Sequence, residues 1–173
     1  MELLFASSLL KLVRMGGKMS GPLYGTAMRR AKASAEILAS ALGTPIVFEK
    51  SFEEWVCDDG TLPPEQFSAR WSQVPEAQKP FFRFMAGYET GLEFSGRVQS
   101  ALNRLLQEYA GKTIVIVTHG GVIAASFHYF FGLSGATPAR VSLNAQHTSI
   151  THWYQLPHGQ TWALERYNDA HHL

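Results

Sequence analysis

The chain has 173 residues, of which 46% are hydrophobic and 17% are charged, and its formal net charge is +1. This is the composition of an ordinary soluble globular protein, and it excludes the intrinsically disordered class. The small net charge gives no reason to expect nucleic acid or a membrane surface as a partner.

The sequence predicts a cytoplasmic protein without a membrane span or a secretory signal. No apolar run reaches the ~18 residues that a bilayer requires. Glu2 stands where a signal peptide carries a basic residue, and Lys11 interrupts the apolar run within residues 1–19. Cys57 is the only cysteine, so no internal disulfide can form, which is typical of a reducing compartment.

Short apolar segments and one clear helix are expected in the first third of the chain. Residues 3–13 carry apolar side chains at helical spacing, although residues 3–6 are equally compatible with the start of a strand. The clearest helix spans residues 27–42, where an apolar stripe is followed by a glycine. Short strands are expected on either side of this helix, at residues 23–24 and, buried, at residues 45–48.

Residues 51–92 form a long irregular segment that is rich in Trp, Phe, Pro and acidic side chains. Its prolines are expected to break any long helix. A segment of this length without clear strands, inside a compact domain, is often a lid or an active-site insertion. A second amphipathic helix is expected after it, over residues 93–109.

Residues 113–117 are a continuous β-branched run, which is typical of a fully buried central strand. The run stops at residues 118–121, Thr-His-Gly-Gly, and an apolar helix is expected over residues 122–131. Backbone N–H groups at such a helix start, together with the helix dipole, favour an anion and most often phosphate. His119 therefore either caps this helix or belongs to a phosphate site, and the tetrapeptide alone leaves both open.

The C-terminal part predicts a β-hairpin, because residues 148–155 and 161–167 alternate in polarity around a short turn. The order of helices and strands predicts a single domain over residues 1–173 with an α/β fold. This fold is a three-layer sandwich, a mostly parallel central sheet with helices on both faces. Ligands are expected at the carboxyl ends of its strands.

Two further segments carry candidate site residues. Arg29 and Arg30 lie where the 27–42 helix begins, a position that the helix dipole disfavours for a cation but that suits phosphate binding. Arg29 is expected in solvent and Arg30 in the pocket. Glu54 precedes Trp55, and a carboxyl group beside an indole suits general acid or base catalysis. An acidic surface turn is the competing interpretation of Glu53 and Glu54.

Together these stretches resemble the histidine phosphatase superfamily, which includes phosphoglycerate mutases and fructose-2,6-bisphosphatases. Residues 26–35 are similar to the family's Ser-Pro-Leu-x-Arg-Ala-x-x-Thr-Ala, which implies that Arg30 binds phosphate. Residues 52–54 are similar to its hydrophobic-x-Glu, which implies that Glu54 donates a proton. Thr-His-Gly-Gly implies that His119 is the second catalytic histidine, with the Gly120 N–H also on the phosphate.

The resemblance covers roughly residues 22–173 and leaves residues 1–21 uncertain. Residues 147–151 are similar to the family's Asn-x-Ser-Ile-Thr strand, with His147 in the asparagine place. The expected ligand is a small phosphorylated substrate or a phosphate anion, and the resemblance implies neither a metal nor a cofactor.

One part of the family pattern is missing from this chain. The family opens with a strand that ends in Arg-His-Gly, and its histidine takes the phosphoryl group. All seven histidines of this chain lie at or after position 119. Met15 stands in a similar context, but a thioether has no proton to lose and cannot replace an imidazole.

Three registers relate the N-terminus to that strand. Met15 matches the histidine in the first register. In the second, residues 1–6 replace the strand and residues 8–15 form a short helix. In the third, residues 2–15 are the family's first helix and everything before it is absent, so the chain is N-terminally truncated. Spacing favours the third register. The gap in the sheet would then leave buried backbone N–H and C=O groups unpaired, at a cost of about 1–3 kcal/mol each. Residues 1–6, upstream residues or a second chain in a homo-oligomer would have to fill the gap to avoid this cost.

Three functions follow as hypotheses. The favoured one is a phosphomonoesterase or phosphoglycerate mutase-like protein that is catalytically impaired because its nucleophile is absent. The second is a pseudophosphatase that binds phosphate esters without turnover. The third is a fragment of a longer, active phosphatase.

Overall fold

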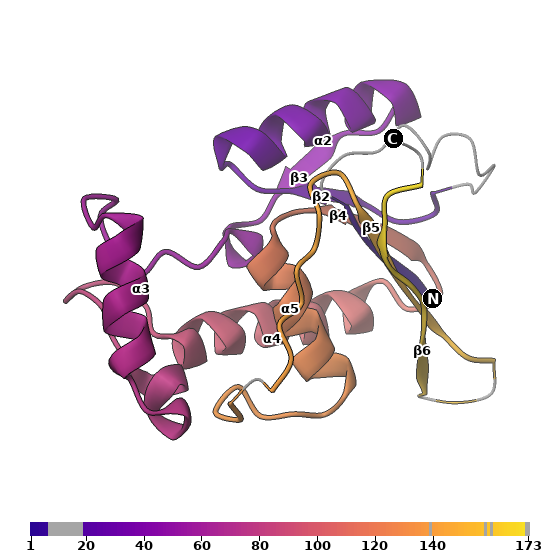
Figure 1. Cartoon of the computed structure of the whole chain (residues 1–173). Helices are drawn as coiled ribbons and strands as arrows, with labels where there is room; N and C mark the ends of the chain where they lie inside the picture. The colour runs from indigo at the N-terminus through magenta and orange to yellow at the C-terminus, as the bar shows by residue number, and fades with distance from the viewer. Residues whose placement is uncertain (7–18, 139, 158, 160, 172–173) are drawn as a thin grey trace.

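The computed structural model describes residues 1–6, 19–138, 140–157, 159 and 161–171. Within these residues the strands form one six-stranded sheet in the order β3-β2-β4-β1-β5-β6 (Figure 1). Neighbours from β3 to β1 run parallel, whereas β5 is antiparallel to both β1 and β6. The strands are β1 (Glu2–Ala6), β2 (Leu23–Gly25), β3 (Ile46–Phe48), β4 (Thr113–Val117), β5 (Ile150–Gln155) and β6 (Trp162–Asp169).

Helices cover both faces of this sheet, as expected for a three-layer α/β sandwich. Helix α2 lies on one face, and α4 and α5 lie on the other (Figure 1). No helix in the described ranges is long and apolar enough to cross a membrane. The helical elements are α2 (Arg29–Leu42), α3 (Pro64–Gln73), α4 (Gly91–Glu108), α5 (Gly120–Phe130) and the short 3-10 helices η1 (Lys50–Phe52) and η2 (Glu76–Phe81).

The apolar run of β4 is confirmed as a fully buried central strand. Ile114 packs with the side chains of α4 and α5, whereas its neighbour Val115 packs with those of α2. Successive side chains point to opposite faces of a sheet. A strand with helices above and below it therefore needs apolar residues at every position, and none of the side chains from Ile114 to Val117 is exposed.

β1 occupies the central position beside β4, and this corrects the favoured register of the N-terminus. Leu3 pairs with Ile114 on one side and with Trp153 of β5 on the other. Residues 2–6 are therefore not helical, because buried Leu3 and Leu4 face opposite layers, which a strand permits. The second register places a strand at residues 1–6, and β1 fills the position between β4 and β5. The interpretations placed on residues 8–15 and on Met15 lie outside the described residues.

Two other expectations differ from the structure. β3 is not buried, since it is an edge strand whose Val47 and Phe48 are 43% and 50% exposed. The segment 51–92 is more ordered than its prolines suggested. Its helix α3 begins at Pro64, where a proline costs no helix hydrogen bond. The helix predicted over residues 27–42 begins two residues later, and the C-terminal hairpin is confirmed as β5 and β6.

Candidate functional site

A cavity of about 400 Å³ opens where β2 and β4 end, and we call it the polar cavity. Four elements or their flanking loops contribute the predicted residues Arg30, Glu54, His119 and Gly120 to its wall. Arg29 is exposed and does not line it, as expected. Its remaining lining residues are Ala31, Ser34, Thr118, Ile123, Ala145, Gln146, His147 and Thr148.

His119 is a buried side chain held from the neighbouring strand. Its Nε2 lies 3.0 Å from the Oγ1 of Thr26, which follows β2 and is itself fully buried. The His119 side chain makes no capping hydrogen bond to α5, so helix capping does not explain its position. Burial lowers the pKa of His119, the negative charge of Glu54 opposes that shift, and the positive charge of Arg30 adds to it. Burial therefore shifts the balance of this side chain toward its neutral form.

The turn before His119 is anchored to the loop that carries Glu54. The Thr118 hydroxyl donates a 2.6 Å hydrogen bond to the carbonyl of Phe52, which is fully buried. Two residues after Phe52, the chain reaches Glu54. The β4 turn and the glutamate loop are thus fixed relative to each other.

Glu54 accepts hydrogen bonds through both carboxylate oxygens. Oε2 accepts from the backbone N–H of Gly121 at 3.1 Å, and Oε1 accepts from that of Trp55 at 3.0 Å. The carboxylate therefore takes one of the free donors at the α5 N-terminus, where the helix dipole stabilises a negative charge. A Cβ at Gly121 would lie 2.1 Å from Oε1, so only glycine allows this approach. These contacts exclude the interpretation of Glu54 as an exposed surface turn.

Arg97 of α4 organises the glutamate loop, and the sequence analysis missed it. Its guanidinium donates to the carbonyls of Ser51 and Glu53 at 2.9 Å each and to that of Glu54 at 3.1 Å. It also forms an ion pair with Glu89 at 2.6 Å, and the Glu89 carbonyl in turn accepts from the indole N–H of Trp55. Arg97 therefore acts as a positioning residue, because it holds the backbone on which Glu54 stands.

The amino-acid pattern contained a sign of this role. In the predicted 93–109 helix, Phe94, Val98 and Leu102 form the buried stripe, and Arg97 lies on the same face at helical spacing. A charged side chain on a buried face requires partners. Thr26 carried no comparable sign, because nothing local to residue 26 indicates that His119 lies beside it.

The polar cavity combines groups that suit a phosphate ester. One guanidinium, one imidazole and a helix N-terminus are donors for a tetrahedral anion. Glu54 lines the same cavity, and a carboxyl group is able to act as a general acid. His147 is a second imidazole on the wall, in the exposed segment that precedes β5. No histidine precedes His119 in the sequence, so β1 is not followed by one.

Comparisons with known proteins identify relatives of this chain. The model of the histidine phosphatase superfamily (branch 1) matches residues 14–170. A metal-independent phosphoserine phosphatase of Arabidopsis thaliana is 26% identical over 169 residues, covering 91% of this chain and 66% of the relative. A phosphoglycerate mutase-like protein 4 from the same plant is 26% identical over 160 residues, covering 87% and 65%. The chain thus spans slightly less than two thirds of these curated relatives.

Solved structures show the same fold. A mycobacterial glucosyl-3-phosphoglycerate phosphatase complexed with VO3 superposes with a TM-score of 0.71 at 17% identity, covering 98% of this chain and 99% of that one. At this level of identity the likeness concerns the fold alone. It confirms the predicted α/β architecture.

Proposed function

The chain belongs to the histidine phosphatase superfamily, and we propose that its polar cavity binds the phosphoryl group of a small phosphate ester or free phosphate. The observation that carries this proposal is the convergence of Arg30, Glu54, His119 and Gly120 on one cavity from separate parts of the chain. The related phosphatases and mutase-like protein support the same ligand class.

The proposed roles follow from the chemistry of each group. Arg30, the imidazole of His119 and the N–H of Gly120 bind the phosphoryl oxygens as donors. Glu54, held on Gly121 and Trp55, faces the bridging oxygen of the ester, which is the atom that needs a proton when the alcohol leaves. Bound phosphate stabilises the positive charge of a protonated His119 and so opposes the effect of burial on its pKa.

We further propose that this chain is impaired in phosphoryl transfer. Transfer to the protein requires a nucleophile that forms a covalent intermediate. The family's nucleophile follows its first strand, and this chain has no histidine after β1 until His119. The remaining groups bind and polarise the ester, but the phosphoryl group has no histidine after β1 to which it can be transferred. The covalent intermediate that would divide the reaction into two easier steps is therefore not formed.

Titration calorimetry with inorganic phosphate tests the binding. We expect saturable binding that weakens about 10- to 100-fold in Arg30→Ala and in His119→Ala, which corresponds to losing one charged hydrogen bond. Arg29→Ala is the matched control, because it removes the neighbouring exposed charge and should change affinity less than threefold or so. Absence of phosphate binding by the wild-type chain, or equal losses in Arg29→Ala and Arg30→Ala, would overturn the proposal.

Turnover and adduct formation test the impairment. The wild-type chain should not hydrolyse 4-nitrophenyl phosphate, and its intact mass should not gain an acid-labile phosphoryl group after incubation with a phosphodonor. An adduct would refute the impairment. Its loss in His147→Asn would then assign the acceptor to His147, the exposed imidazole of the cavity.

The alternative is an active phosphatase in which a longer protein supplies the nucleophile. The observation behind this alternative is that the chain covers only 66% and 65% of the lengths of the two curated relatives. Sequencing the gene upstream of Met1 tests it, since it requires an in-frame Arg-His-Gly. An upstream strand would also have to displace β1, which already pairs with both β4 and β5. Hydrogen exchange of the β1 amides in the longer protein would report that displacement.

A further inference from the structure

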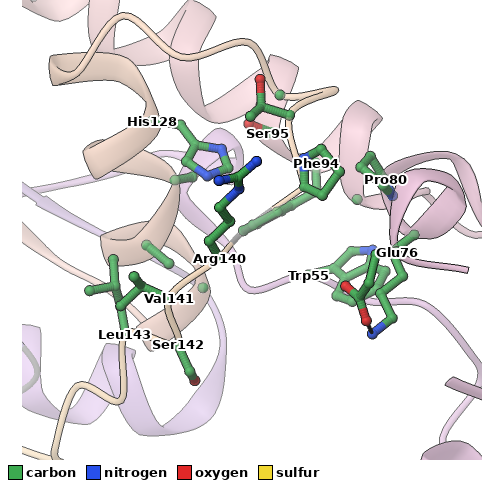
Figure 2. Close-up of a pocket in the computed structure, with 18 of the residues that line it drawn as sticks. Trp55, Glu76, Pro80, Phe94, Ser95, His128, Arg140, Val141, Ser142 and Leu143 are labelled. Atoms are coloured by element: carbon green, nitrogen blue, oxygen red, sulfur yellow. Dashed lines mark hydrogen bonds and ion pairs between the residues drawn. The ribbon is translucent and has the colours of Figure 1, made fainter. Parts of the chain in front are cut away.

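A second cavity, of about 480 Å³, is lined by Gly121, the neighbour in sequence of Gly120 in the polar cavity, and has a different character (Figure 2). We call it the aromatic cavity. Helices α3, α4, α5 and η2, the loop that carries Trp55 and the segment before β5 contribute to its wall. Its apolar lining residues are Trp55, Trp71, Pro80, Phe94, Ala124, Ala125, Pro138, Val141 and Leu143.

The aromatic side of this cavity is held firmly by neighbouring rings. The rings of Trp55 and Trp71 meet edge to face at 6.0 Å between centroids, and Trp71 also stacks on Phe84 at 5.4 Å. The Trp55 indole is additionally fixed by its hydrogen bond to the Glu89 carbonyl. This wall is therefore preformed, so a ligand would not have to order it on binding.

The charged groups of the aromatic cavity do not make its interior ionic. Glu76 and Lys79 form an ion pair with each other. Arg140 is an exposed residue whose side chain points toward His128 at one end of the cavity (Figure 2). Trp55, Phe94 and the residues of α5 thus enclose a space suited to an uncharged, apolar group.

Glu54 stands at the boundary between the two cavities. Glu54 lines the polar cavity, whereas Gly121 and Trp55, whose backbone N–H groups donate to its carboxylate, both line the aromatic one. A proton donor for ester cleavage must lie within hydrogen-bond reach of the bridging oxygen. An ester placed so that its phosphoryl group lies near Arg30 and His119 has its carbon substituent on the far side of that oxygen, toward Trp55.

We propose that the aromatic cavity binds the organic group of the phosphate ester, and that this group is apolar and about the size of an aromatic ring. The inference rests on the proposed phosphate binding in the polar cavity. The aromatic cavity would then favour the binding of aryl and similar apolar phosphate esters over small polar ones such as glycerol phosphate.

A pair of non-hydrolysable ligands tests this inference. Benzylphosphonate and methylphosphonate carry the same anionic group, and a methylene replaces the bridging oxygen of phenyl phosphate in the first. We expect benzylphosphonate to bind about 10- to 100-fold more tightly to the wild-type chain, the change that accompanies burial of one ring-sized apolar group. Equal affinities for the two ligands would overturn the inference while leaving phosphate binding intact. Binding of neither ligand would instead contradict the proposed function.

A cavity-filling substitution locates the organic group. Ala124 lies on the face of α5 that lines the aromatic cavity, and Ala124→Phe should remove the advantage of benzylphosphonate without changing the affinity for methylphosphonate. Ala33→Phe places the same side chain on the exposed face of α2 and serves as the control. An advantage that persists in Ala124→Phe would place the ring elsewhere and overturn the inference.

A measurement on the wild-type chain makes the test independent of whether Ala124→Phe folds. In protein labelled with ¹⁵N-tryptophan, benzylphosphonate should shift the indole resonances of Trp55 and Trp71, and methylphosphonate should shift them far less. Trp153 and Trp162 do not line the aromatic cavity and act as internal controls. Unchanged Trp55 and Trp71 resonances at saturating benzylphosphonate would contradict the proposal.

Discussion

The strands β1 and β4 lie side by side in the centre of the sheet, run parallel and are paired residue for residue from Glu2↔Thr113 to Ala6↔Val117. Leu3 of β1 and Ile114 of β4 are both fully buried in the same layer. The two strands differ in the residues that come directly after them. β4 is continued by Thr-His-Gly-Gly, whereas β1 is continued in the sequence by Ser-Ser, without a histidine.

This difference separates the requirements of folding from those of chemistry. The sheet needs β1 for its buried side chains and for its backbone pairing with β4 and β5. The polar cavity depends instead on the side chains that follow the strands, such as His119 after β4. A chain can therefore keep the architecture of its family although no histidine follows its first strand before position 119.

The largest expected effect tests whether β1 contributes to folding as β4 does. Leu3→Ala and Ile114→Ala should each lower the free energy of unfolding by about 2–5 kcal/mol, because each truncates a fully buried aliphatic side chain in the same layer. Ile37→Ala, at a side chain that is 69% exposed, should cost less than about 1 kcal/mol. Chemical denaturation measures all three. A loss at Leu3 no larger than that at Ile37 would refute the central position of β1.

The next effect concerns the support of the site on the β4 side. Arg97→Ala should lower the free energy of unfolding by about 1–3 kcal/mol, because three carbonyls and the Glu89 carboxylate lose their donor. Arg104→Ala is the control, since it removes an exposed ion pair with Glu49 that should be worth under about 1 kcal/mol.

Hydrogen exchange separates positioning by Arg97 from general destabilisation. In Arg97→Ala the amides of Gly121 and Trp55, which donate to Glu54, should exchange faster, and those in β6 should not. Uniform acceleration across the sheet would argue that Arg97 has only a structural role.

The two glycines after His119 provide a matched pair with a smaller effect. Gly121→Ala should lower the free energy of unfolding by about 1–2 kcal/mol, because its Cβ would displace the Glu54 carboxylate and break the hydrogen bond from Gly121. Nothing lies within 4 Å of a Cβ at Gly120, so Gly120→Ala should be neutral or slightly stabilising. Thermal denaturation of both variants compares them, and equal losses would contradict the described position of Glu54.

Most of the fold could be predicted from the sequence because its elements have local causes. The β-branched run of β4 and the apolar stripe of α2 each determine their own secondary structure. β1 was assigned to the wrong element because Leu3 and Leu4 suit either a strand or a helix. Pairing with β4, more than a hundred residues away, decides between them. The exposure of β3 was missed for a similar reason, since strand order determines which strand lies at an edge.

The candidate site divides in the same way. Arg30, Glu54 and His119 were identified through short motifs, and the structure brings them to one cavity. Thr26 and Arg97 act through contacts over 93 and 43 or more residues, and no local pattern identifies the partners in those contacts. The aromatic cavity requires six segments to meet, so it could not be predicted from any one of them.

The smallest effect concerns the histidine that follows β4 and has no counterpart after β1. Burial lowers the pKa of His119, so the native state binds fewer protons at this site than the unfolded state. The free energy of unfolding should therefore fall as the pH drops through the unfolded pKa of about 6.5, by at most ~1.4 kcal/mol for each unit by which the two pKa values differ.

His119→Gln keeps a side-chain amide near Thr26 but cannot titrate. Between pH 8 and pH 5 its free energy of unfolding should fall less than that of the wild-type chain. Burial also lowers the pKa of His128, but His128 is present in both proteins, as are Arg30 and Glu54. The difference between the two plots of unfolding free energy against pH therefore isolates His119. A wild-type slope no steeper than that of His119→Gln would show that His119 is not buried in its neutral form, and phosphate binding would then begin from an already protonated ring.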